Sequence, residues 1–222
     1  MPIVIRRAWA FARWLFRLEI GIWRSLLLWV TRRRPAQRPG VLVFPYSRDL
    51  VPLMAAFIVG STLELVVVHL LLPWETVRLL ADVLSIWGLL WMLGYLASVK
   101  VFPHLLAEDE LRIRYGTTVD LAVPLEAIAE VTSQRRSAAT RKTVSIEHDD
   151  DRAALNVAVL KQTKIAIQLR RPTTLKLRGG TETITELRIY VDNPRAFVTA
   201  ARQRLSEPQA VEPVASQAGD PA

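Results

Sequence analysis

The sequence has no cysteine and only three histidines among its 222 residues. The absence of cysteine excludes disulfide bonds, thiolate metal sites and cysteine nucleophiles. His69, His104 and His148 are scattered, and no P-loop, dinucleotide-binding glycine motif, G-x-S-x-G or H-E-x-x-H sequence is present. We therefore expect a protein that is not an enzyme and that needs no cofactor or metal ion.

Acidic residues are almost missing from the N-terminal segment. Residues 1–38 contain nine arginines and one acid, Glu19, so this segment carries the whole formal charge of +8. The rest of the chain has equal numbers of basic and acidic side chains. A basic arm on a neutral body differs from the general basicity of nucleic-acid-binding proteins, and we expect no nucleic-acid partner.

Charges are also rare in two apolar runs, residues 51–72 and 77–98. Each run would span about 33 Å as a helix, and a bilayer core is about 30 Å thick. Only four residues join them, with Trp74 suited to a membrane–water interface. The sequence predicts a helical hairpin that crosses the membrane twice. The alternative is a pair of buried helices in a soluble protein.

The distribution of basic residues predicts the orientation of this hairpin. The arginine-rich segment and Arg48 precede the first run, and Lys100 follows the second. The turn carries Glu75 and no basic residue before Arg78. Because basic loops stay in the cytoplasm, we expect a multi-pass plasma-membrane protein with both termini cytoplasmic.

Residues 1–34 predict a basic amphipathic helix. At helical spacing, Arg6, Arg13, Arg17 and Arg24 form one narrow stripe. The opposite side is apolar and comprises Ala8, Phe11, Leu15, Ile22, Leu26 and Trp29. We expect this helix to lie in the membrane surface. The side chains expected to contact the anionic inner leaflet are Arg6, Arg13, Arg17, Arg24, Arg32, Arg33 and Arg34. The alternative is packing against the protein's own cytosolic domain, and residues 35–50 read as an extended linker.

From residue 101 the apolar pattern changes to period two. Clear alternation occurs at 111–116, 164–169 and 187–191, with shorter runs at 118–123, 127–132, 154–160 and 174–178. Alternation indicates an antiparallel sheet or barrel with one buried face, and Gly179-Gly180 suits a hairpin turn. Asp192-Asn193-Pro194 begins a helix through Leu205, with Phe197, Val198, Ala201 and Leu205 facing inward. Residues 206–222 should be disordered.

The order of short strands and one C-terminal helix resembles a pleckstrin-homology-like (PH-like) domain. His104 to Gly116 resembles the opening hairpin of bacterial PH-like domains, and Val123 to Ile128 resembles the segment that follows. The whole chain looks like uncharacterised two-span membrane proteins of actinobacteria that carry such a domain after a helical hairpin. The resemblance covers roughly residues 51–205 and implies a scaffold or regulatory membrane protein without catalytic residues.

Polar residues inside the two apolar runs are candidate sites. Glu64 lies near mid-bilayer, and His69 and Asp82 lie nearer the turn. In an antiparallel hairpin, depth matching predicts a Glu64–Ser85 hydrogen bond and a His69–Asp82 pair. These groups could form a proton or ion relay in a transporter or channel subunit, or polar contacts between helices. No ligand pair has metal-binding i, i+4 spacing, so we expect no metal there.

Residues 133–151 are a second candidate, with Arg135, Arg136, Arg141 and Lys142 followed by four acids. These basic residues could hold anionic lipid headgroups, or the segment could be a solvated hairpin. In PH-like domains that bind inositides, the first loop usually holds the phosphates. Here that loop, residues 107–110, is acidic and unsuited to them.

The sequence thus predicts an α+β membrane protein in five parts: interfacial helix 1–34, linker 35–50, transmembrane hairpin 51–98, cytosolic PH-like antiparallel barrel or sandwich 101–205 capped by its helix, and tail 206–222. We expect a membrane-anchored interaction or scaffold module. Its expected partners are the anionic bilayer and other proteins or further copies of the chain. The alternatives are a transporter or channel subunit that uses Glu64, and an anionic-lipid sensor.

Overall fold

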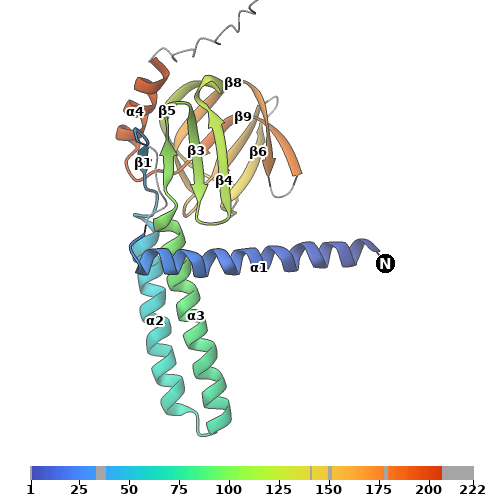
Figure 1. Ribbon diagram of the computed structural model, residues 1–222, viewed down its shortest axis with the longest axis vertical. Helices are drawn as coiled ribbons and strands as arrows, with labels where there is room; N and C mark the ends of the chain where they lie inside the picture. The colour runs from blue at the N-terminus through green and yellow to red at the C-terminus, as the bar shows by residue number, and fades with distance from the viewer. Residues whose placement is uncertain (1, 34–38, 141, 150–151, 178–179, 207–222) are drawn as a thin grey trace, which may run out of the picture.

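The computed structural model describes residues 2–33, 39–140, 142–149, 152–177 and 180–206. These residues form an α+β protein in which two long helices project from a β domain (Figure 1). The described helices are α1 (Pro2–Val30), α2 (Leu50–Leu71), α3 (Glu75–Val101), the 3-10 turn η1 (Leu125–Ala127) and α4 (Pro194–Ser206). The expected tail, apart from Ser206, lies outside the described residues.

Helices α2 and α3 form the hairpin that the apolar runs predict. Both are long and apolar enough to cross a membrane by length and composition. None of the most apolar stretch of α2 is buried, and only 11% of that of α3 is buried. Helix α3 extends beyond its predicted end, because Val99 and Val101 enter the core of the β domain.

The β domain contains two sheets among the described residues. Strands β1 (Leu42–Phe44), β2 (His104–Leu106), β3 (Glu110–Tyr115) and β4 (Val119–Pro124) pair in sequence order. The second sheet has the order β5-β8-β9-β7-β6. Its strands are β5 (Ile128–Ser137), β6 (Val144–Asp149), β7 (Arg152–Val157), β8 (Gln162–Leu177) and β9 (Gly180–Ile189).

The prediction of an antiparallel barrel or sandwich is confirmed only in part. Strands β7 and β9 pair in parallel, and the described strands form two sheets that do not close into one barrel. The physical reason is that period-two alternation reports a buried face and carries no information on the direction of the partner strand. The expected alternation itself is confirmed, since Ile165 and Ile167 on β8 and Leu187 and Ile189 on β9 are fully buried.

Two segments differ from their predicted role. The expected linker contributes β1, whose Leu42 and Phe44 pair with Leu106 and His104 of β2. The runs at 164–169 and 174–178 belong to one strand, β8, whose register shifts between Gln168 and Thr173. Gly179 of the expected Gly179-Gly180 turn lies outside the described part, although β8 and β9 form the expected antiparallel hairpin.

Helix α4 closes the core as the sequence predicts. The Asn193 side-chain oxygen accepts the Ala196 N–H at 3.2 Å and caps the first turn. Phe197 and Ala201 are buried, and the Phe197 ring packs edge-on to Phe44 with 4.9 Å between centroids. The helix therefore ties the β1 segment to the second sheet.

A group of side chains fixes the β domain to the start of the hairpin, and we call it the Asp49 latch. The Tyr190 hydroxyl donates a hydrogen bond to Asp49, the residue before α2. Lys164 donates to the Tyr190 oxygen at 2.7 Å and lies 3.6 Å from the Asp49 carboxylate. Asp192 accepts the Arg48 N–H at 3.0 Å. Bonds to α2 from both β8 and the end of β9 restrict movement between domain and hairpin.

Candidate membrane-surface site

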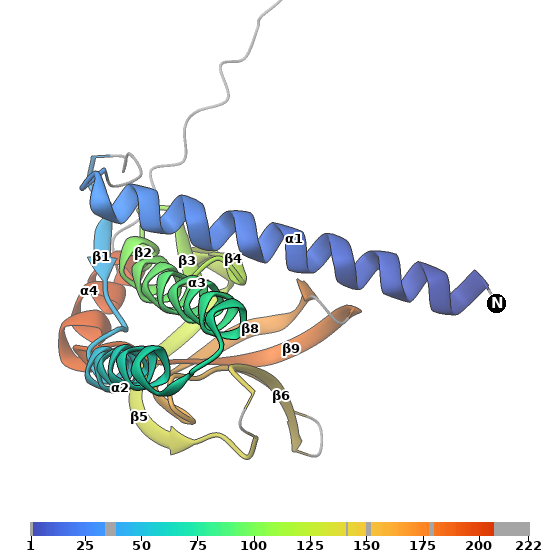
Figure 2. The ribbon, with the colours of Figure 1, turned by 90° about the horizontal axis from the view of Figure 1, so that it is seen from below.

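Helix α1 runs across the hairpin at the level where α2 and α3 meet the β domain (Figures 1 and 2). It crosses α3 at Gly94, which is buried. A Cβ at Gly94 would lie 2.5 Å from Ile22 Cγ2, so only glycine permits this close approach. Gly21 of α1 lies against Thr117 in the β3–β4 turn. The crossing therefore joins all three parts of the molecule at one place.

The only acid of the N-terminal segment is held at this crossing. Glu19 accepts the indole N–H groups of Trp23 at 2.8 Å and of Trp91 at 3.1 Å. The Trp23 ring also packs edge-on to Trp87, with 5.6 Å between centroids. Two donors satisfy the carboxylate where it approaches the apolar hairpin, so Glu19 and the tryptophans fix how α1 is rotated about its axis.

Two arginines of the α1 stripe face the β domain. Arg17 and Arg24 line a cavity of about 320 Å³ together with Arg114 and Asp120 of the first sheet. Asp120 accepts hydrogen bonds from Arg112 at 2.6 and 2.8 Å. Its pKa is held below the usual value, because these bonds and the nearby arginine charges outweigh the raising effect of burial. This cavity therefore contains an acid that offsets part of its positive charge.

The rest of α1 also exposes apolar side chains. They are Trp9, Leu15, Phe16, Ile20, Leu27, Trp29 and Val30. The predicted apolar side is not wholly free, however, since Ile22 is buried against α3. The packing alternative is thus realised in part: the C-terminal half of α1 packs on α3 and the β3–β4 turn, while its N-terminal half extends past them (Figure 2).

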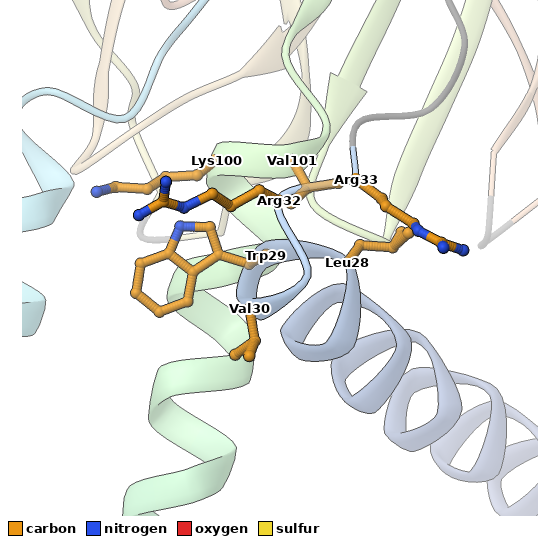
Figure 3. A pocket seen from close by; sticks show the side chains of 7 residues that line it. All are labelled: Leu28, Trp29, Val30, Arg32, Arg33, Lys100 and Val101. Atoms are coloured by element: carbon orange, nitrogen blue, oxygen red, sulfur yellow. The ribbon is translucent and has the colours of Figure 1, made fainter.

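A basic pocket of about 660 Å³ lies where α1 ends against the last turn of α3 (Figure 3). Helix α1 ends in a Schellman turn, with the Arg33 N–H donating to Leu28 O at 2.9 Å and the Arg32 N–H to Trp29 O at 3.1 Å. Arg32 has a φ of 54°, a conformation that usually requires glycine. The residues that line the pocket are Leu28, Trp29, Val30, Arg32, Arg33, Lys100 and Val101.

Two cations converge in the basic pocket. The Lys100 ammonium lies 5.8 Å from the centre of the Trp29 ring. Arg32 and Lys100 extend in the same direction, whereas Arg33 extends in the opposite direction (Figure 3). None of the described residues that line the pocket is acidic. In contrast to the cavity beside Asp120, this pocket has no carboxylate in its lining to balance its charge.

A strained turn lies at the hairpin end of the second sheet. Leu160 and Lys161 both have positive φ, 49° and 64°, and Val159 and Gln162 exchange backbone hydrogen bonds of 3.1 and 2.9 Å around them. This is a two-residue turn between β7 and β8 with the backbone of a type I′ hairpin, which normally requires Asn or Gly. The turn is followed by Lys164, which belongs to the Asp49 latch beside the start of α2. The Leu160 side chain in the turn is 46% exposed.

The polar residues of the hairpin meet one of the two predictions. The His69 ring nitrogen lies 2.7 Å from the Asp82 carboxylate, which confirms that pair. Glu64 is exposed and, in the described part of the chain, forms no hydrogen bond with Ser85. Equal depth in a hairpin does not place two residues on facing sides, and this is why the Glu64–Ser85 prediction is wrong. The described residues contain no metal-binding group.

The basic side chains predicted to gather in the 133–151 segment lie apart from one another. Arg135 donates to the Gln162 side chain at 2.8 Å, Arg136 lies on β5 and Lys142 is exposed. Arg141 of this loop lies outside the described part. The same is true of two side chains expected to contact the inner leaflet, those of Arg6 and Arg34. Among the described residues of this loop, no common site forms.

The second sheet contains a buried ion cluster that the sequence analysis did not predict. Arg188 donates to Glu186 at 2.8 and 3.0 Å and to Glu147 at 2.9 Å. Burial would raise the pKa of Glu186, but the bonds from Arg188 outweigh it and hold that pKa below its usual value. Glu186 and Arg188 are two residues apart on one strand, a spacing that places them on one face. That spacing is the signal that could have revealed the pair.

Comparisons with models of protein families, with curated proteins and with solved structures gave no match for this chain.

Proposed function

We propose that this chain is a two-span integral protein of the plasma membrane with both termini in the cytoplasm. Its β domain, a noncatalytic PH-like interaction or scaffold module, is held against the inner leaflet by α1. The observation that carries the proposal is the separation of surfaces at the α1–α3 crossing. Apolar side chains are exposed along the hairpin, whereas the domain beyond the crossing buries most of its apolar side chains in a core.

The exposure of the hairpin supports a bilayer environment. A core helix of a soluble protein is mostly buried, whereas Leu70, Leu71 and Leu84 are 75, 74 and 73% exposed. Each Å² of apolar surface left in water costs about 25 cal/mol, and a continuous apolar surface of this length marks a membrane or protein contact. In hydrocarbon the same surface carries no such cost.

The position of α1 across the hairpin supports a role as an anchor on the membrane surface. A helix that crosses a membrane-spanning hairpin at its cytoplasmic end lies in the headgroup layer, with its arginines toward water and its leucines toward lipid. Leu15 and Val30 are exposed, while Arg17 and Arg24 face the β domain. Together with the Asp49 latch, this arrangement gives the domain a single orientation and presents the same surface to cytosolic proteins.

The test of the interaction role uses two glycines of α3. At Gly94 a valine side chain would strike Ile22, whereas at Gly88 an added Cβ meets nothing within 4 Å. A photo-crosslinking amino acid at exposed Thr181 on β9 reports partners in intact membranes. We expect a discrete protein adduct in the parent chain and in Gly88→Val, and its loss in Gly94→Val.

Folding and insertion are checked in the same samples by hydrogen exchange of β8 and β9 and by resistance to alkaline extraction. A parent chain that inserts and forms no protein adduct contradicts the interaction role. An adduct that survives unchanged in a folded Gly94→Val protein contradicts the role of α1 in orienting the domain.

A further inference from the structure

We propose that the basic pocket between the end of α1 and the last turn of α3 binds the phosphate of an anionic phospholipid headgroup. The inference rests on the proposed placement in the membrane, since α1 and α3 then meet in the headgroup layer. Arg32 and Lys100 are the phosphate ligands, and Trp29 forms the wall below them. The pocket gives the anchor a defined lipid site in addition to general attraction to the leaflet.

The charges of the pocket call for an anion. Arg32 and Lys100 extend to the same side and repel each other, and no acidic residue is among the described residues that line the pocket. Arginine and lysine both bind phosphate, arginine through its planar fork and lysine as a compact charge. The indole of Trp29, with the Lys100 ammonium above its ring, suits the membrane–water boundary.

The backbone of Arg32 is a second and independent observation. Glycine would end α1 in the same turn without strain, yet the position carries an arginine at φ 54°. Strained residues of this kind cluster at ligand-binding sites, where the ligand uses the direction that the strain imposes. Here the Schellman turn aims the Arg32 side chain to the Lys100 side of the pocket, while Arg33 takes the other side.

The apolar part of the lining suits a lipid better than a free ion. Val30 points toward the hairpin (Figure 3) and is exposed, and Leu28 and Val101 complete the lining. A phosphate bound between Arg32 and Lys100 would thus have its glycerol and acyl chains directed along α3 into hydrocarbon. The cavity beside Asp120 has three arginines but contains its own carboxylate, so its need for a ligand is weaker.

The experiment measures lipid binding by the full chain in detergent, using native mass spectrometry with added phosphatidylglycerol, phosphatidylcholine or inorganic phosphate. The variants are Arg32→Gly and Lys100→Gln, with Arg13→Gln as a matched charge control, since Arg13 is exposed on α1 and lines neither cavity. Arg32→Gly keeps the turn that ends α1, so a loss of binding is not a loss of fold.

We expect one tightly bound phosphatidylglycerol per chain. Arg32→Gly and Lys100→Gln should each weaken it about fivefold to tenfold, consistent with roughly 1 kcal/mol per basic side chain near an anionic headgroup. Arg13→Gln should leave this bound lipid unchanged. Equal loss in all three variants, or equal retention of phosphatidylcholine, overturns the site. Displacement of the lipid by inorganic phosphate at similar concentration overturns the lipid as its ligand.

Insertion of each variant into membranes is measured separately by alkaline extraction. A chain that is extracted contradicts the proposed function, whereas a chain that stays inserted and retains no phosphatidylglycerol contradicts only the lipid site.

Discussion

The hairpin and the β domain contain the same types of apolar residue, but the hairpin exposes them and the domain buries them. Leu155 and Ile167 of the domain are fully buried, whereas Leu71 and Leu84 of the hairpin are 74 and 73% exposed. A single aqueous solvent would favour burial in both regions. The proposed function explains the difference by two surroundings, water for the domain and hydrocarbon for the hairpin, with α1 at the boundary.

The largest expected effect contrasts the two regions directly. Ile167→Ala removes a fully buried side chain from the domain core and should lower the free energy of unfolding by about 2–5 kcal/mol. Leu84→Ala on the hairpin surface should change it little, because no packed cavity is created. Denaturant unfolding of the full chain in micelles, followed by hydrogen exchange of β8 and β9, measures both. Similar losses in the two variants would remove the contrast.

The second prediction uses two of the three histidines, His104 and His69. His104 accepts the Arg114 N–H through Nδ1 at 3.1 Å and so donates from Nε2 to Tyr190 O at 3.0 Å. Complete burial lowers the pKa of His104 from 6.5 to about 4. The unfolded chain therefore binds the proton first, and domain stability is full above pH 6.5 and falls as the pH decreases toward 4. Protonation of His104 should lower the free energy of unfolding by up to about 3 kcal/mol once the pH falls below 4.

The control for this pH dependence comes from the hairpin. His104→Gln should be less stable at neutral pH and should flatten the stability profile between pH 4 and 6.5. His69→Gln should leave the profile of the domain unchanged, because His69 is exposed and pairs with Asp82 outside the domain. Thermal unfolding of the full chain at stepped pH measures all three proteins. An unaltered slope in His104→Gln would mean that other groups cause the acid sensitivity.

The smallest expected effect lies at the boundary between the regions. Arg32→Gly should stabilise the lipid-free chain by about 1 kcal/mol, since glycine adopts the positive φ without strain. Arg33→Gly should give no such gain, because Arg33 is not among the positive-φ residues. Melting temperatures of the delipidated proteins test this difference. A gain in Arg33→Gly alone would contradict the strain argument.

The sequence predicted features that depend on local pattern. The helical hairpin, the alternation in β8 and β9 and the Asn193 cap all follow from local composition, from periodicity or from a single cap residue. The same local rules could not find the β1–β2 pairing, the parallel β7–β9 pair or the meeting of Arg32 with Lys100. These contacts join residues far apart in the chain, and their geometry depends on how whole elements pack.

The candidate site shows the same limit residue by residue. Arg32 and Arg33 were identified by their charge, but nothing in the sequence distinguishes their directions. That difference comes from the backbone of the turn, which is visible only in the structure. Glu64 and Ser85 failed to pair because depth along a hairpin is readable from sequence, whereas the side on which a residue projects depends on helix packing.

The most direct test of the membrane account uses the absence of cysteine. Single substitutions Trp74→Cys in the hairpin turn and Leu160→Cys in the β domain place one thiol in each region, at exposed positions. In intact cells, a membrane-impermeant maleimide should label position 74, and position 160 only after permeabilisation. Labelling of both positions from the same side before permeabilisation would contradict a hairpin that crosses the bilayer.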